Sequence, residues 1–125
     1  MRSAARQLDD TLSALADPTR RRVVELLKGG PRRAGELSEA VAMSAPAMSR
    51  HLRVLRTSGL VADAPAEDDA RARVYTLQRA PFAQLSAWLA EVEAFWTDQL
   101  AGFKAFAESM AAAPSPSAHD PEQPE

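Results

Sequence analysis

The sequence AGELSEAVAMSAPAMSRHLRVLRTSGL, which runs from Ala34 to Leu60, decides the fold of this 125-residue chain. It contains two short segments of helical periodicity, and only Ala42 and Met43 separate them. So short a connection permits only a sharp turn between the helices. The stretch therefore predicts a helix-turn-helix pair.

The second helix of the pair carries both a start signal and a stop signal. Ser44 can accept a hydrogen bond from a free amide of the first turn, and Pro46 removes an amide that has no partner there. Gly59 suits the left-handed residue that follows a helix in a Schellman motif. These signals predict a helix over about 45–58.

This helix has two unlike faces. Met48, Leu52 and Leu55 recur at spacings of four and three and should pack against the first helix, roughly Gly35–Val41. The residues on the opposite side are Pro46, Ser49, Arg50 and Arg53. A basic outer face is typical of a helix that reads DNA, and the alternative is an ordinary solvated face.

The uneven charge distribution along the chain favours DNA as the binding partner. The formal net charge is only −2, but residues 1–58 carry eleven Arg and Lys against six Asp and Glu, while residues 59–125 carry four against eleven. The basic half contains the helix-turn-helix. Its field would attract a phosphate backbone, with an affinity that falls steeply as salt rises.

Composition excludes several kinds of chemistry. The chain has no cysteine, so it has no disulfide, thiolate metal site or cysteine nucleophile. No nucleophile, base and orienting group occur in a recognisable arrangement, so we expect neither an enzyme nor a cofactor. No run approaches the roughly 18 apolar residues that span a bilayer, and no apolar signal core is present at the start. We therefore expect a cytoplasmic protein without membrane contact.

Two further helices are predicted before the pair. The first carries three leucines at spacings of four and three, Leu8, Leu12 and Leu15. It should span about Gln7–Ala16, and Asp17 and Pro18 should then cap and open the next helix, which Gly29 ends. Arg20–Arg22 lie near the positive end of that helix dipole, which indicates an acidic partner within the fold or a nearby phosphate.

After the pair, the hydrophobic period changes from helical to two. Leu60–Ala64 and Arg71–Leu77 are predicted to form two strands of a hairpin, or wing. Arg71 and Arg73 would share one face of the second strand and could offer basic groups to a DNA backbone. The acidic loop residues 67–69 would repel phosphate, so the wing would brace the domain more than it reads the minor groove.

Pro81 opens the last and longest predicted helix, which extends about 30 residues to Met110. It holds six of the seven aromatic residues, and a domain this small cannot cover them alone, which predicts a homodimer. The expected interface residues, on the first and last helices, are Leu8, Leu12, Trp88, Leu89, Val92, Phe95, Trp96, Leu100 and Phe103. A pocket for a hydrophobic effector between the helices is an alternative, and the effector is unknown.

The whole pattern predicts a mainly α fold with a small β-hairpin. It corresponds to a winged helix-turn-helix of about five helices and a two-stranded wing, in one domain over residues 7–110. Residues 111–125 are rich in Pro, Ala, Ser and acidic residues and lack a large apolar side chain. We expect this tail to be disordered.

Four segments together carry a resemblance to the ArsR family of bacterial winged-helix transcriptional regulators. They are ALADPTRRRVVELL (14–27), GELSEAV (35–41), SAPAMSRHLRVLRTSGLV (44–61) and WLAEVEAFWTDQL (88–100). The resemblance implies a homodimer that places two recognition helices in successive major grooves of an inverted-repeat operator and usually represses transcription. The DNA-facing positions it implies are Ser44, Ala45, Pro46, Ser49, Arg50 and Arg53, with His51 nearby.

The chain departs from the metal-sensing members of that family. The segment 35–41 lacks the cysteines that the resemblance would place there, and the last predicted helix has four acidic residues but no histidine. The two histidines of the chain are His51 and His119. Since a transition-metal site needs several N or S ligands, we expect a metal-independent DNA-binding repressor. The alternative is a winged helix used for protein contact.

Overall fold

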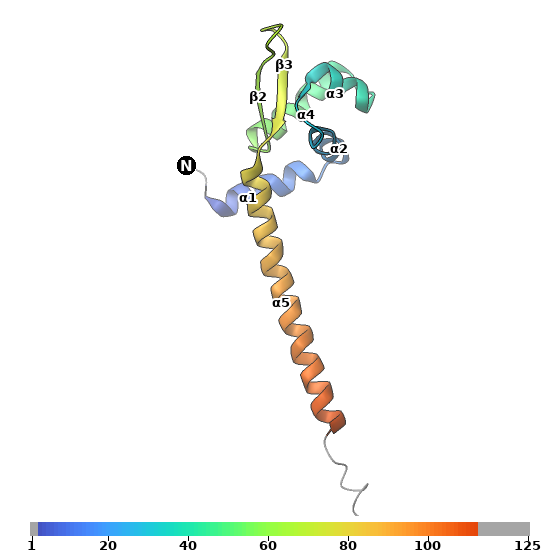
Figure 1. Ribbon diagram of the computed structural model, residues 1–125, viewed down its shortest axis with the longest axis vertical. Coiled ribbons are helices and arrows are strands. Elements are labelled where there is room, and N and C mark those ends of the chain that lie inside the picture. The colour runs from blue at the N-terminus through green and yellow to red at the C-terminus, as the bar shows by residue number, and fades with distance from the viewer. Residues whose placement is uncertain (1–2, 113–125) are drawn as a thin grey trace, which may run out of the picture. The chain divides into compact units, whose positions relative to one another are not determined.

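The computed structural model describes residues 3–112, which form five α-helices and three short β-strands (Figure 1). In chain order the elements are α1 (Ala4–Leu15), α2 (Pro18–Leu27), β1 (Arg32–Arg33), α3 (Ala34–Val41), α4 (Ala45–Thr57), β2 (Val61–Pro65), β3 (Arg73–Leu77) and α5 (Arg79–Ala112). The predicted class, mainly α with a small β-hairpin, is confirmed.

The chain divides into two units, the first ending at Ala87 and the second beginning at Trp88, and α5 contributes to both. A single domain over 7–110 stays a prediction. Of the tail, Ala111 and Ala112 are helical, as the last residues of α5. Residues 113–125, for which the sequence predicts disorder, lie outside the described part.

The core of the first unit lies among α1, α2, α3, α4 and the start of β2. Its buried apolar residues are Ala14, Val23, Val24, Leu27, Leu37, Met48, Leu52, Leu55, Leu60 and Val61. Full burial of one large apolar side chain contributes roughly 1.5–3 kcal/mol to stability. Six of these ten residues lie on α2 and α4, so these two helices contribute most of the buried apolar residues of this unit.

Helix α1 buries a different face from its leucine stripe. It begins at Ala4, earlier than predicted, because the Ser3 hydroxyl caps it by accepting from the amide of Arg6 at 3.2 Å. Its buried residues are Thr11 and Ala14, whereas Leu12 is 40% exposed. Thr11 can be buried because its hydroxyl donates to the Gln7 carbonyl oxygen at 3.0 Å.

The turn between α3 and α4 is as sharp as the sequence predicts. Ala42 adopts a left-handed conformation with φ 58°, and the amide of Met43 donates to the carbonyl oxygen of Ser38 at 3.0 Å. The chain can therefore reverse within two residues. This brings α4 directly onto α3.

Helix α1 is tied to the far end of α4. The Gln7 side-chain amide donates to the carbonyl oxygen of Ser58 at 2.8 Å. Ser58 is the C-cap of α4 and is buried, so this bond satisfies one of the free carbonyls at the end of that helix.

The sheet has one strand more than the predicted wing, and its order is β1-β3-β2. The added strand is β1, in which Arg32 pairs with Tyr75 and Arg33 with Val74. Two residues are too few to show a period of two, so the sequence pattern does not reveal such a strand.

The hairpin strands differ slightly from their predicted bounds. β2 covers Val61–Pro65 rather than 60–64, and β3 begins at Arg73 rather than Arg71. Arg71 instead lies in the turn before β3, where its amide donates to Asp69 Oδ1 at 3.0 Å. The prediction that Arg71 belongs to the strand and shares a face with Arg73 is therefore wrong, because the turn takes up that residue.

Candidate nucleic-acid interface

Helix α4 begins and ends as its capping residues require. The Ser44 hydroxyl accepts a hydrogen bond from the amide of Ala47 at 3.3 Å. At the other end Gly59 has φ 82°, and the amide of Leu60 donates to the carbonyl oxygen of Leu55 at 2.9 Å. This is the predicted Schellman motif. Local signals thus fix the length of the helix.

The helix packs through one face and presents the other to solvent. Met48, Leu52 and Leu55 are at most 2% exposed. The predicted contact residues on or beside α4, apart from His51, are all exposed, namely Ser44, Ala45, Pro46, Ser49, Arg50 and Arg53. The structure therefore gathers these six residues along and beside the solvent face of α4.

Arg50 and Arg53 have no partner within the described protein. Among residues 3–112, neither guanidinium group takes part in a hydrogen bond or an ion pair. A guanidinium carries five N–H donors in a planar fork, which suits a phosphate or the edge of a guanine. Both groups are thus available to an external ligand that accepts hydrogen bonds.

His51 differs from the other predicted contact residues of α4. Its side chain is only 21% exposed, and its Nδ1 lies 3.2 Å from Arg20 Nη1 and 3.9 Å from Asp17 Oδ2. The amide of Arg20, which donates to Asp17 Oδ2 at 3.0 Å, lowers the pKa of that carboxyl against the opposing effect of burial. His51 therefore links α4 to the start of α2.

Arg20 and Arg21, near the start of α2, have their acceptors within the fold, and these are backbone carbonyls rather than the acidic group that the sequence indicates. Arg20 Nε donates to the Ala14 carbonyl oxygen at 2.7 Å, and its Nη2 donates to that of Ser13 at 3.3 Å. Arg21 Nη1 donates to the carbonyl oxygen of Leu15 at 2.8 Å. These carbonyls end α1 and carry the negative end of its dipole, which attracts cations.

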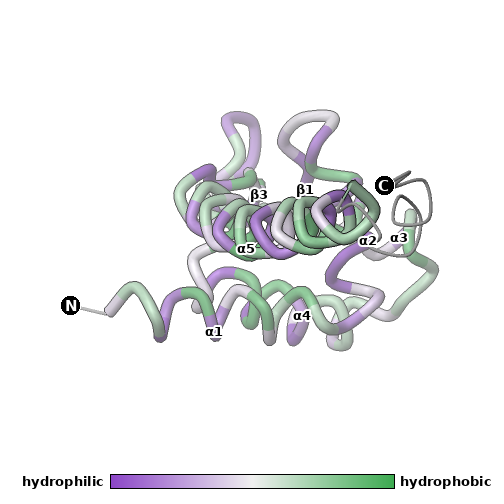
Figure 2. The backbone as a smooth tube through the Cα atoms, turned by 90° about the horizontal axis from the view of Figure 1, so that it is seen from below, coloured by the Kyte–Doolittle hydropathy of each residue, from purple (hydrophilic) through white to green (hydrophobic). Residues whose placement is uncertain are grey.

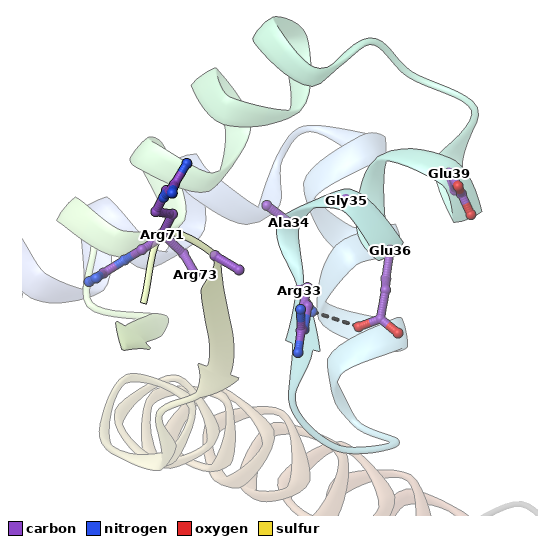
Figure 3. A pocket seen from close by; sticks show the side chains of 8 residues that line it. Arg33, Ala34, Gly35, Glu36, Glu39, Arg71 and Arg73 are labelled. Atoms are coloured by element: carbon purple, nitrogen blue, oxygen red, sulfur yellow. Dashed lines mark hydrogen bonds between the residues drawn. The ribbon is translucent and has the colours of Figure 1, made fainter. Parts of the chain in front are cut away.

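The hairpin places basic side chains near α3. Arg33, Arg71 and Arg73 help to line one hollow between the hairpin and the start of α3 (Figure 3). Figure 3 also shows the Glu36 carboxylate turned back to the amide of Arg33, which donates to it at 2.8 Å. Arg33 in addition forms an ion pair with Asp68 of the hairpin loop. These contacts brace the loop against α3.

A second hollow lies between α4 and the hairpin, and it contains residues that the sequence analysis did not single out. Its lining residues are Ser49, Arg53, Arg56, Asp63, Arg73 and Tyr75. Arg56, Asp63 and Tyr75 are the three that the sequence analysis missed. The signal for Arg56 is its place seven residues after Ser49, on the same face of a helix. The signal for Asp63 is a charge at an inward position of a strand.

Helix α5 exposes most of its apolar side chains in a single chain. Figure 2 shows hydrophobic residues recurring along it. Those with the largest exposure are Trp88 40%, Leu89 48%, Phe95 54%, Trp96 57%, Leu100 65%, Phe103 69%, Phe106 64% and Met110 64%. Val92 is intermediate, as is Leu8 of α1. The predicted interface residues are thus largely uncovered in the isolated chain.

Metal ligands do not gather in the part of the chain that the structure describes. Among residues 3–112, no three His, Asp or Glu side chains lie close enough together to hold an ion. His119 lies outside these residues. None of the described helices combines the length and apolarity needed to cross a bilayer.

A short three-stranded sheet beside a helix-turn-helix defines the winged helix-turn-helix class of proteins. Residues 17–63 match the family model of the bacterial regulatory proteins of the arsR family. The HTH-type transcriptional regulator Rv2034 of Mycobacterium tuberculosis is 43% identical over 101 residues, which are 81% of this chain and 89% of the relative. The chain belongs to the ArsR family.

Two more comparisons agree with this assignment. The transcriptional repressor SdpR of Bacillus subtilis is 38% identical over 56 residues, which are 45% of this chain and 62% of that protein. The crystal structure of the ArsR family transcriptional regulator RHA00566 has a TM-score of 0.68 and 34% identity, covering 78% of this chain and 97% of that one. The winged helix-turn-helix fold is thus shared with solved members of the family.

Proposed function

We propose that this protein is a homodimeric transcriptional regulator that binds a specific DNA duplex through α4. The observation that carries the proposal is the pair of exposed guanidinium groups of Arg50 and Arg53, which no side chain or backbone group of residues 3–112 engages. They lie on a helix whose other face is firmly packed. The names of the relatives, a transcriptional regulator and a repressor, support the same function.

The apolar face of α5 supports the homodimer. Each aromatic side chain can bury about 150–250 Å². Five aromatic residues of α5 are at least 40% exposed, namely Trp88, Phe95, Trp96, Phe103 and Phe106. A monomer rarely exposes apolar patches larger than a few hundred Å², whereas a two-fold axis covers such a patch with its own copy. Leu8 and Leu12 of α1 belong to the proposed interface as well.

The available side chains support regulation without a metal. The chain offers no thiolate, and one of its two histidines, His51, already lies within 3.2 Å of an arginine. A transition-metal site needs several nitrogen or sulfur ligands that converge. Operator affinity should therefore be the same in the presence of Zn²⁺ and of a chelator.

Selection of duplexes from a random pool tests the proposal directly. We expect enrichment of an inverted repeat whose half-sites are separated by about one helical turn, or 10–10.5 base pairs. Sedimentation equilibrium should give two chains for each duplex. A matched variant with Arg50→Ala and Arg53→Ala should keep the fold and the dimer but enrich no sequence.

The competing function is a winged helix that docks on an acidic protein. Salt dependence does not separate the two functions, because both are electrostatic. A folded wild-type protein that enriches no duplex over scrambled sequence would overturn DNA regulation. A folded monomer that binds one half-site would overturn only the dimeric arrangement.

A further inference from the structure

The hollow between α4 and the hairpin has an excess of positive charge. Three guanidinium groups line it, from Arg53, Arg56 and Arg73, together with one carboxylate, from Asp63. Two positive charges thus have no counterpart among its lining residues. Ser49 and Arg53 also belong to the exposed face of α4, so the hollow continues the proposed DNA-binding surface toward the hairpin.

Asp63 is the anchor of this cluster. Its side chain is only 11% exposed, its Oδ2 accepts from Arg73 Nε at 3.0 Å, and its Oδ1 lies 3.8 Å from Arg56 Nη1. A carboxylate at such a depth is costly unless cations pair with it. The pairing therefore constrains one arginine of α4 and one of β3 at the same time.

Strand register explains how Asp63 reaches both arginines. Asp63 lies directly opposite Tyr75, and Pro65 lies opposite Arg73, so Asp63 and Arg73 form a diagonal pair on one face of the hairpin. The same face carries Val61, which is buried in the core. Helix α4 packs on β2 from this side, which brings Arg56 into reach.

The remaining donors of the cluster are suited to an oxyanion. Arg56 and Arg73 keep side-chain exposures of 52% and 43%, and each has N–H groups beyond those that contact Asp63. The phenol of Tyr75 is another donor that lines the hollow, and burial, followed by the Asp63 charge, raises its pKa further above neutral pH. Arginines bind phosphate through paired N–H···O contacts.

We propose that this hollow binds one phosphate of the duplex backbone in each half-site, and that Asp63 is the positioning residue that holds Arg56 and Arg73 for it. The proposal rests on the proposed function, because the phosphate belongs to the DNA that α4 reads. The carboxylate of Asp63 would thereby connect the hairpin to α4. An acidic residue would then favour the binding of an anion, because it positions the arginines that contact the anion.

The variant Asp63→Asn tests this role because the two possible roles of Asp63 predict opposite changes in DNA affinity. If Asp63 merely repels DNA, removing its charge strengthens binding. If it positions the arginines, affinity for the selected duplex falls roughly tenfold and the salt slope falls by about one unit. Glu67→Gln is the matched control, since it removes the same charge from an exposed loop position and should leave binding unchanged or slightly tighter.

Neutral methylphosphonate linkages, introduced one at a time into the duplex, locate the contact. The wild-type protein should lose affinity at one linkage in each half-site to which Asp63→Asn is insensitive. Arg56→Gln should be insensitive to the same linkage. This second variant can replace Asp63→Asn in the test if Asp63→Asn does not fold. Equal sensitivity of wild type and variants at every linkage would overturn the inference, as would Asp63→Asn binding as tightly as Glu67→Gln. Wild-type protein that selects no duplex would instead overturn the proposed function.

Discussion

Two groups of arginines in the first unit illustrate how differently the same side chain can be used. Near the start of α2, Arg20 and Arg21 donate to the carbonyls that end α1, and Arg20 also lies against His51. On α4, Arg50 and Arg53 are exposed and unengaged within residues 3–112. A guanidinium that already has acceptors inside the protein stabilises the fold, whereas one without them is available to a ligand.

The largest effect that this comparison predicts is the loss of stability from Arg20→Ala. Arg20 makes three side-chain contacts, to Ser13, Ala14 and His51, and hydrogen bonds to charged groups contribute about 1.5–3 kcal/mol. We expect the free energy of unfolding to fall by about 2–3 kcal/mol in a urea titration.

Arg22→Ala is the control for that variant. Arg22 is adjacent, equally charged and exposed, and its side chain forms no hydrogen bond or ion pair with the rest of residues 3–112. Its removal should change the free energy of unfolding by no more than about 0.5 kcal/mol. Equal losses of unfolding free energy for Arg20→Ala and Arg22→Ala would show that positive charge near the start of α2, rather than the contacts with the α1 carbonyls, stabilises the fold.

Arg50→Ala should have the opposite effect to Arg20→Ala, because it should weaken DNA binding and leave the stability of the fold almost unchanged. The free energy of unfolding should stay within about 0.5 kcal/mol of wild type, because nothing in the described protein binds this side chain. Operator affinity should fall by about 1–3 kcal/mol if Arg50 reads a base, and the salt slope should fall by about one unit if it contacts only phosphate. Fluorescence anisotropy at several salt concentrations separates these cases, and an unchanged affinity and slope would remove Arg50 from the interface.

The smallest expected effect is the change in stability on substitution of Asp17, whose carboxylate accepts a hydrogen bond from the amide of Arg20. Because the pKa of Asp17 is lowered in the folded protein, its charge stabilises the fold above the unfolded pKa, and this stabilisation is lost as pH falls through the lower folded value. Asn caps helices about as well as Asp, so Asp17→Asn should cost only a few tenths of a kcal/mol at neutral pH.

The pH profile of that variant provides the check. Urea titrations of wild type and Asp17→Asn between pH 3 and 6 should show the stability difference shrinking as the pH falls below about 4, the ordinary pKa of an aspartate carboxyl. A difference that stays constant over this range would show that the Asp17 charge contributes nothing to the free energy of unfolding.

Sequence alone predicts the features that depend on neighbouring residues. The Ser44 cap, the Gly59 stop and the apolar stripe of α4 are local, and each is found where the pattern places it. The exposure of Arg50 and Arg53 follows from the same periodicity. The change of period after Gly59 predicts the wing, and the structure and the solved relatives confirm the winged arrangement.

The features that sequence did not predict depend on tertiary contacts. Strand β1 exists only because β3 supplies its hydrogen bonds, and the role of Asp63 depends on the register that sets it diagonal to Arg73. The carbonyl partners of Arg20 likewise belong to another helix. Helical periodicity carries no information about these pairings, since each joins segments whose relative placement is set by packing.

The attachment of α1 to α4 at two points has a mechanical consequence. Gln7 bonds to Ser58 at the end of α4, and Arg20 joins the end of α1 to His51, seven residues earlier. At 1.5 Å per residue these points lie roughly 10 Å apart along the axis. A helix held at one point can rotate about that point, whereas a helix held at two points cannot. The tilt of α4 within this unit is thus set by its two contacts with α1 and the start of α2.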